Sequence, residues 1–179
     1  MNIEIRKIDP EHLAGRVCVF QYESPGHYRV KITEKEDGWT IDLTRENFPE
    51  TFHKREFEKI VTDYKGKSEI HFAYVDEKEA GFIQFEFQEW NQSARVWDID
   101  VLPEFRRMGV GKALMELCIS RSKELGARRI ILETQTSNLK AIAFYRKMGF
   151  ELAGFDASCY FNDDIARNEV RLEMARYLD

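Results

Sequence analysis

The stretch "DIDVLPEFRRMGVGKAL", residues 98–114, decides how this chain folds. Its first residues alternate between apolar and polar as a β-strand does, and the strand ends at Pro103, which lacks a backbone N–H. After Gly109 the apolar residues recur at helical spacing, so the pattern predicts a helix. The loop between strand and helix contains two glycines and three cationic residues. We expect a loop of this composition to hold an anion.

Three kinds of phosphate-binding loop can be compared with this segment. A Walker A loop needs a glycine, four residues, then Gly-Lys and Ser or Thr. Gly111-Lys112 supplies the pair, but Arg106 replaces the upstream glycine and Ala113 the hydroxyl residue. A dinucleotide-binding loop needs a third glycine, where Leu114 stands. The pattern Arg-x-x-Gly-x-Gly does fit. Its glycines let the backbone approach a pyrophosphate, and the amides at a helix start point toward it.

The hydrophobic pattern on both sides of this loop predicts one sheet with helices. Alternating or short apolar runs predict strands at 2–8, 69–76, 81–90, 94–102, 128–134, 150–155 and 168–178. Amphipathic or helix-prone runs predict helices at 9–20, 44–66, 111–126 and 137–150, with a loop near Pro49. Antiparallel strands followed by alternating strands and helices predict an α/β fold with a mixed sheet and helices on its faces.

Length and composition limit the possible functions. With 179 residues, of which 43% are hydrophobic, we expect a single domain spanning 1–179. No apolar run reaches the length of a membrane span, and the N-terminus lacks a signal peptide's apolar core, so we expect a cytoplasmic protein without membrane contact. The net charge of −5 argues against a nucleic-acid partner and is compatible with a cationic substrate.

The three cysteines, Cys18, Cys118 and Cys159, lie far apart in the sequence. Their spacing predicts neither a disulfide framework nor a metal site. We expect buried, reduced thiols and no bound metal.

Two segments resemble the signature motifs of the GNAT acyltransferases, which transfer an acyl group from acyl-CoA to an amine. "IDVLPEFRRMGVGKAL" (99–114) resembles the family's strand and pyrophosphate loop. "LETQTSNLKAIAFYRKMGF" (132–150) resembles the second signature, a strand and a helix with the pattern Asn…Phe-Tyr…Gly-Phe. The likeness is specific over 94–150. It implies the GNAT fold, a mostly antiparallel sheet with splayed central parallel strands and helices on both faces.

Within the family, three segments are similar to the streptothricin acetyltransferases: "WNQSARVWDIDV" (90–101), "LETQTSN" (132–138) and "GFELAGFDASCYFND" (149–163). A second likeness, to the ribosomal-protein N-terminal alanine acetyltransferases, runs through 132–145. Arg107 and Met108 depart from the family's usual Gly and Arg, Gln or Lys. Because backbone amides make most of the phosphate contacts, this departure leaves the expected cofactor unchanged.

The resemblance implies acetyl-CoA as co-substrate. The main chain of Ile99, Asp100 and Val101 would pair with its pantetheine amides like an added strand. Asn138 would hydrogen-bond the pantetheine arm near the start of its helix. The pyrophosphate would lie on a loop made of Arg106, Arg107, Met108, Gly109, Val110, Gly111 and Lys112.

Amide formation from a thioester needs an acid for the departing thiolate and a base for the amine. Tyr145 lies seven residues after Asn138, on the same helix face, and is the candidate acid; the alternative is a core aromatic. Glu133 and Asp98 are the candidate bases. We prefer Glu133, where the resemblance to the ribosomal enzymes places their base, and assign Asp98 to contact a cationic amine. A structural hydrogen bond is the alternative for either carboxylate.

These residues predict direct transfer of an acetyl group to a primary amine, without a covalent enzyme intermediate. Cys118 falls on an apolar helix face, so no thiol nucleophile is evident. The best guess for the acceptor is a small cationic amine such as the β-lysyl amine of streptothricin. The alternatives are a protein N-terminal or lysine acetyltransferase and a non-catalytic acyl-CoA-binding module.

Acceptor specificity is expected to come from the first half of the chain. An acidic stretch there contains an aromatic residue and could bind a cation or form a solvated loop. Its members are Glu34, Glu36, Asp37, Trp39 and Asp42. Dimers are frequent in the GNAT family, so the resemblance also allows a homodimer.

Overall fold

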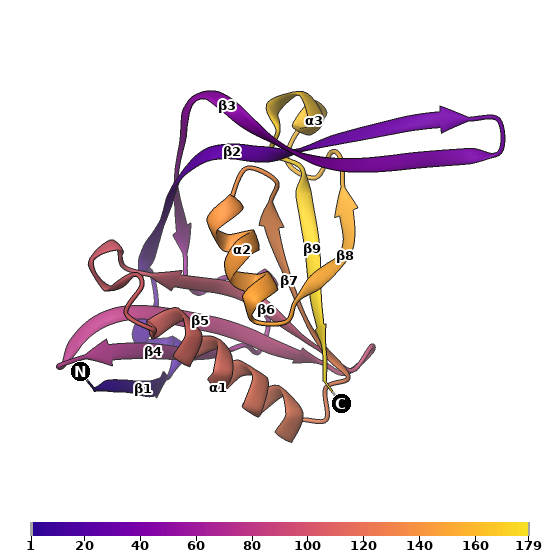
Figure 1. Cartoon of the computed structure of the whole chain (residues 1–179). Helices are drawn as coiled ribbons and strands as arrows, with labels where there is room; N and C mark the ends of the chain where they lie inside the picture. The colour runs from indigo at the N-terminus through magenta and orange to yellow at the C-terminus, as the bar shows by residue number, and fades with distance from the viewer. Residues whose placement is uncertain (1, 179) are drawn as a thin grey trace. The chain divides into compact units, whose positions relative to one another are not determined.

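The computed structural model describes residues 2–178 and divides them into two compact units (Figure 1). The first unit contains the chain up to Phe20, Phe57–Leu132 and the end of the chain from Ala175. The second contains Gln21–Glu56 and Glu133–Met174. Strands β2, β3, β7 and β9 run through both.

The first unit is built on a sheet whose strands follow the order β1-β4-β5-β6-β7. The first three pairs are antiparallel, and β6 pairs with β7 in parallel. The strands are β1 (Ile3–Ile8), β4 (Glu69–Val75), β5 (Lys78–Gln88), β6 (Ser93–Val101) and β7 (Arg129–Gln135). Three short 3-10 turns connect elements of this unit: Pro10–Leu13, Asp63–Lys65 and Pro103–Phe105.

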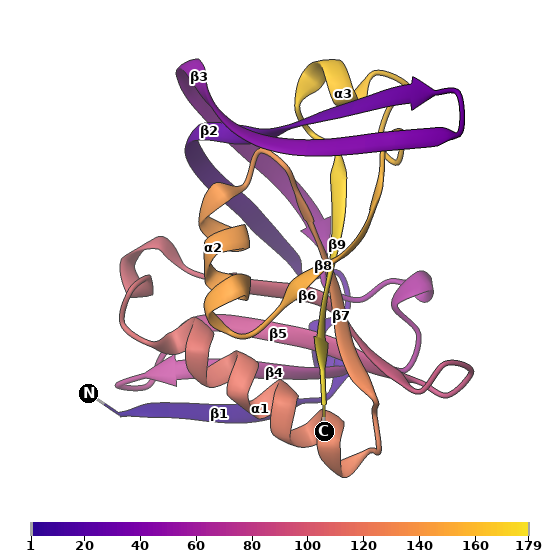
Figure 2. The ribbon, with the colours of Figure 1, turned by 45° about the vertical axis from the view of Figure 1, so that its right-hand side comes forward.

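Helix α1 (Val110–Glu124) packs against the sheet of the first unit (Figure 2). Its buried side chains recur at helical spacing, because only one face of the helix meets the sheet. They are Val110, Leu114, Met115, Cys118 and Ser122. A separate apolar cluster consists of Leu13, Ile60, Ile70, Phe72 and Phe82.

The second unit contains the rest of β7, followed by neighbours β9 and β8, and a two-stranded ribbon of β2 and β3. Its remaining elements are α2 (Leu139–Lys147), β8 (Glu151–Asp156), α3 (Asp164–Arg167) and β9 (Arg171–Tyr177). The ribbon strands are β2 (Val17–Lys35) and β3 (Gly38–Lys59). Asn138 caps α2, because its Oδ1 accepts a hydrogen bond from the amide of Ala141 at 3.1 Å.

The predicted fold class, a mixed α/β fold with a mostly antiparallel sheet, is confirmed. The predicted strands and helices between residues 69 and 178 are present, and the first predicted strand corresponds to β1. Helix α3 was not predicted.

Two predicted helices in the first half are wrong. Residues 9–20 form a single 3-10 turn and the start of β2, and residues 44–66 mostly belong to β3. The Glu, Lys and Arg residues of β3 favour a helix locally, but pairing with β2 along a long ribbon overrides that preference. Pro49 is tolerated because a two-stranded ribbon has open edges.

Two further findings concern membranes and thiols. Among residues 2–178, no helix is long and apolar enough to span a bilayer. The three cysteines are free thiols, but only Cys118 is fully buried. Cys18 is partly buried and Cys159 is exposed, so the expectation that all three are buried is wrong.

Candidate active site

The glycine loop of the first unit joins β6 to α1 with an unusual backbone. Arg107 has a φ of 65° and Gly109, the N-cap of α1, has a φ of 88°. The first amide bonded within the helix is that of Ala113, which donates to the Gly109 carbonyl at 3.0 Å. The amides of the preceding helical residues have no intrahelical acceptor. The loop therefore offers backbone N–H groups and the positive end of a helix dipole to an anion.

Two of the three cationic side chains of this loop already have partners. Arg106 Nε donates to the Val101 carbonyl at 2.8 Å, and its Nη2 lies 3.7 Å from Asp100 Oδ1. Lys112 Nζ lies 3.5 Å from Glu116 Oε1. Arg106 thus ties the loop to the end of β6. Anion binding here would depend more on the backbone than on these two side chains.

Strand β6 presents a main-chain edge beside this loop. Its parallel pairing with β7 extends from Ser93, opposite Arg129, to Arg95, opposite Ile131. The segment Ile99–Val101 lies beyond that register, with its other edge paired to β5. On that side a Cβ on Gly81 would lie 2.4 Å from the Asp100 carbonyl oxygen, so the close approach requires glycine.

Asp98 lies in a buried polar network. Its side chain is 5% exposed, and Oδ2 accepts a hydrogen bond from Lys65 Nζ at 2.6 Å. Lys65 is 2% exposed and also lies 2.9 Å from Glu58 Oε1. In the orientation that satisfies its neighbours, the Gln84 amide donates to Asp98 Oδ2 at 3.0 Å. Burial alone would lower the pKa of Lys65, but the bonds to Asp98 and Glu58 outweigh it and raise the pKa.

This network surrounds an irregularity in the sheet. The register between β5 and β6 shifts between Gln84 and Phe85, so that Gln84 faces Asp98 while Phe85 faces Val96. Trp97 is the extra residue of this bulge. The carboxylate that we assigned to the substrate therefore holds a lysine beside a β-bulge, and its contact with a substrate stays a prediction.

Asp100 is the other carboxylate of β6. Its side chain is 14% exposed. Burial raises its pKa, while Arg106 and a backbone hydrogen bond at Val101 oppose the rise.

In the second unit, Glu133 is held by two side chains. Tyr160 donates its phenol hydrogen to Oε1 at 3.3 Å, and Arg171 Nη2 lies 3.2 Å from Oε2. The Glu133 side chain remains 36% exposed. Burial raises the pKa of Tyr160, and the negative charge of Glu133 raises it further, so the phenol stays protonated and donates.

Tyr160 is a site residue that the sequence analysis missed. Its loop is fixed by the fully buried Asp164, whose carboxylate accepts the amides of Tyr160 and Phe161 at 2.8 and 2.9 Å. Tyr160 lies 27 residues after Glu133, so no local pattern connects them. Only its place in the quoted "GFDASCYFND" segment pointed to this region.

A second partly buried phenol, that of Tyr22, contacts the same strand and the residues that follow it. Tyr22 donates to Gln135 Oε1 at 2.9 Å and lies 2.7 Å from Ser137 Oγ. Burial raises its pKa. Because Gln135 is two residues after Glu133, both side chains lie on the same face of β7.

Two predicted site residues belong to the α2 segment. Asn138 lies at the start of the helix and Tyr145 on its last turn. Asn138 uses its Oδ1 to cap the helix, which leaves its amide nitrogen as the group for a ligand. Tyr145 is 7% exposed and packs against Phe144 and Phe150, with ring centroids 5.5 and 6.0 Å apart. The core packing that we considered for Tyr145 is thus present, and the role of its phenol as an acid stays a prediction.

Within the first unit the structure brings together the predicted β6 residues and the glycine loop. Within the second it places Glu133 beside Tyr160 and Arg171, and it places Asn138 and Tyr145 on one helix segment. The acidic stretch expected to bind a cation lies at the turn between β2 and β3, where Glu34, Glu36, Asp37, Trp39 and Asp42 are exposed.

The end of β6, the glycine loop and the start of α1 follow one another in the first unit and offer main-chain groups to a ligand with an anionic part. The sequence model of the acetyltransferase (GNAT) family matches residues 39–150. The chain therefore belongs to the acetyltransferase (GNAT) family, a class of acetyl-CoA-dependent N-acetyltransferases.

Several known members share more specific features with the chain. Streptothricin acetyltransferase A of Bacillus subtilis is 30% identical over 75% of this chain and 77% of its own length. Streptothricin acetyltransferase of Streptomyces lavendulae is 38% identical, but the match covers only 45% of this chain and 43% of that enzyme. A crystal structure from Bacillus anthracis, of a protein assigned as a streptothricin acetyltransferase in complex with acetyl coenzyme A, is 27% identical. It covers 100% of both chains with a TM-score of 0.78.

Proposed function

We propose that this protein transfers the acetyl group of acetyl-CoA to a small cationic amine, and that the β-lysyl amine of streptothricin is its acceptor. The observation that carries this proposal is the extent of the structural likeness. The family match stops at residue 150, whereas the likeness to the acetyl-CoA-bound Bacillus anthracis protein covers 100% of the chain. The proposal treats residues 1–179 as one N-acetyltransferase domain.

In this proposal the glycine loop and the end of β6 hold most of the co-substrate. The loop of residues 106–112 has a left-handed backbone at Arg107 and Gly109, and the amides at the start of α1 have no intrahelical acceptor, which suits a pyrophosphate. The main chain of Ile99–Val101 offers an edge with which pantetheine amides can pair. A backbone N–H of that edge would also polarise the thioester carbonyl.

Glu133 and Tyr145 would supply the proton transfers. Glu133 accepts the proton of the ammonium group, directly or through water, and Tyr160 and Arg171 hold its carboxylate in place. Tyr145 donates a proton to the departing thiolate, and the Asn138 amide binds the pantetheine arm. In the first unit, Asp98 would attract the cationic amine while it keeps its bond to Lys65.

The direct test measures release of free CoA thiol from acetyl-CoA with streptothricin as acceptor, followed by mass spectrometry of the product. We expect saturable release and one acetyl group on the β-lysyl moiety. Acetylated peptides with unmodified streptothricin would instead support a protein acetyltransferase. Tight acetyl-CoA binding without transfer to any amine would support a non-catalytic module.

A variant tests the acid. Tyr145→Phe removes only the phenol hydroxyl, so we expect kcat to fall by about 10²-fold with little change in acetyl-CoA affinity. Tyr177→Phe is the matched control, because Tyr177 is 60% exposed. If Tyr145→Phe turns over like the control, Tyr145 is only a core aromatic.

A further inference from the structure

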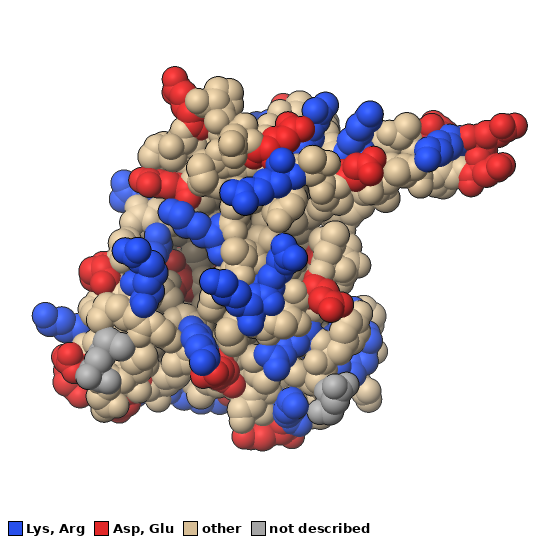
Figure 3. Space-filling model, viewed as in Figure 1, with Lys and Arg blue, Asp and Glu red and all other residues tan. Residues whose placement is uncertain are grey.

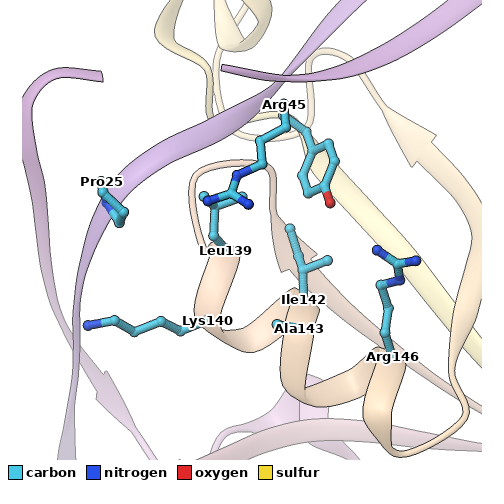
Figure 4. A pocket seen from close by; sticks show the side chains of 8 residues that line it. Pro25, Arg45, Leu139, Lys140, Ile142, Ala143 and Arg146 are labelled. Atoms are coloured by element: carbon cyan, nitrogen blue, oxygen red, sulfur yellow. The ribbon is translucent and has the colours of Figure 1, made fainter. Parts of the chain in front are cut away.

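A groove of about 360 Å³ opens in the second unit, between the base of the β2–β3 ribbon and helix α2 (Figure 4). The ribbon lines it with Pro25, Tyr28 and Arg45, and α2 supplies the other lining residues. Sites for small molecules have volumes of about 300–1,000 Å³, so the groove can hold a small ligand. None of the residues assigned above to acetyl-CoA or to the acceptor lines it.

The groove lies on a different side of α2 from the residues proposed to serve acetyl-CoA. An α-helix turns by about 100° per residue. Ile142, Ala143 and Arg146, which line the groove, are therefore centred roughly 100° around the helix axis from Asn138 and Tyr145. A ligand in the groove would contact α2 without using the side that carries the proposed acid.

The two walls of the groove are held together by the fold. The Tyr28 amide donates a hydrogen bond to the carbonyl of Thr136 at 3.0 Å, and Thr136 is fully buried three residues before α2 begins. Within the ribbon, a Cβ on Gly26 would lie 2.3 Å from the carbonyl oxygen of Glu46, so the close approach of the two strands requires glycine. The ribbon is thus fixed beside α2 at this point.

The groove has an apolar middle and a positive charge on either side of it. Figure 4 shows Ile142 between the side chains of Arg45 and Arg146, with Lys140 further out on α2. Ile142 is 5% exposed, whereas the three cationic residues are exposed. In the wider view of Figure 3, Lys and Arg side chains gather over α2. The groove therefore offers two separated guanidinium groups to one ligand.

These cations have no carboxylate partner among residues 2–178. Lys140 and Arg146 have no acidic residue three or four positions away, so no helical ion pair can form. Glu46 follows Arg45 in the sequence but pairs with Arg29 at 3.3 Å. A cationic acceptor such as streptothricin would be repelled here, whereas an anion would be attracted.

We propose that this groove binds a small organic dianion that has a carboxylate at each end and an apolar body between them. Arg45 holds one carboxylate and Arg146 the other, because the guanidinium fork matches a carboxylate with two hydrogen bonds. The apolar body covers Ile142. A phosphate monoester fits less well, since both of its negative charges lie at one end. The proposal does not depend on the acceptor proposed above.

Terephthalate is the probe, because its two carboxylates lie at opposite ends of an apolar ring. It is titrated calorimetrically into the full chain saturated with acetyl-CoA, so that the glycine loop is already occupied. We expect one saturable site. Phenyl phosphate and 4-methylbenzoate carry their charge at one end only, and both should bind at least about 10-fold more weakly.

Two variants locate the site. Arg45→Gln and Arg146→Gln each remove one positive charge, so each should weaken terephthalate binding by about 10-fold. The matched control is Lys147→Gln, because Lys147 is exposed on the same helix but does not line the groove. This control should bind terephthalate like wild type. Circular dichroism confirms that each variant is folded.

Four results would overturn the proposal. The first is wild type that shows no saturable binding of terephthalate up to millimolar concentrations. The second is phenyl phosphate that binds as tightly as terephthalate, which would indicate one anion subsite. The third is an equal loss for Lys147→Gln and Arg146→Gln, which would indicate attraction to the general surface charge. The fourth is a glutamate-rich peptide that binds more tightly than terephthalate, which would make the groove a peptide site.

Discussion

Asp98 in the first unit and Glu133 in the second are the two candidate bases, yet their surroundings differ. Asp98 is 5% exposed and bonded to a lysine that is itself 2% exposed. Glu133 is 36% exposed and shares its oxygens between a phenol and an arginine. Breaking a buried, paired carboxylate costs stability, because its charge is then left without compensation. A carboxylate that is oriented but accessible can still accept a proton from a substrate.

The largest effect is expected when the buried pair is broken. Lys65→Met leaves the Asp98 carboxylate buried without the positive charge of Lys65, which should lower the free energy of unfolding by about 3–5 kcal/mol. The double variant Lys65→Met/Asp98→Asn removes both charges, so its loss should be clearly smaller. Urea denaturation measures both.

The control for this prediction is Lys7→Met, since the Lys7 side chain is 60% exposed in its pair with Glu69. That variant should change stability by no more than about 1 kcal/mol. Equal losses for Lys65→Met and Lys7→Met would mean that Asp98 is compensated by other groups, and the contrast between the two carboxylates would fail.

The next largest effect is a loss of activity when the carboxylate of Glu133 is removed. Glu133→Gln keeps the shape of the side chain but cannot accept a proton, so kcat should fall by about 10²-fold, with stability nearly unchanged. The loss should shrink as pH rises toward the pKa of the acceptor amine, because the free amine then needs no base. Rates of thiol release over a pH series measure this.

The matched control is Glu173→Gln, which also removes a carboxylate from Arg171, at 2.6 Å. This variant should retain most of the activity. If it loses as much as Glu133→Gln, the effect of Glu133 comes from the position of Arg171 and not from proton transfer.

These comparisons also show which elements and contacts could be predicted from the sequence. Apart from α3, the strands and helices after residue 69 were predictable because their apolar periodicity is strong and several of their ends carry glycine or proline. The glycine loop was predictable because the residues that form it are consecutive in the sequence. The partner of Asp98 was not, because Lys65 lies 33 residues upstream in a segment whose composition favours a helix. Tyr160 was also missed because its contact lies far away in sequence. It reaches Glu133 only through a loop that Asp164 fixes.

Asp100 is less buried than Asp98 and more buried than Glu133. The pH dependence of its contribution to stability is the smallest predicted effect. Burial raises its pKa above the ordinary value of 3.8, against the opposing charge of Arg106. A carboxyl group whose pKa is higher in the folded state stabilises the fold at low pH, and this contribution is lost as pH rises through the folded-state pKa. Asp100→Asn removes that dependence. The variant should therefore be more stable than wild type at neutral pH.

The difference between Asp100→Asn and wild type should close as pH falls below the ordinary value of 3.8, and urea midpoints over a pH series measure it. A variant that is less stable at neutral pH would show that the Arg106 contact outweighs burial. Asp100 would then resemble Asp98 as a carboxylate stabilised by a cationic side chain, and the contribution of β6 to co-substrate binding would come from its backbone.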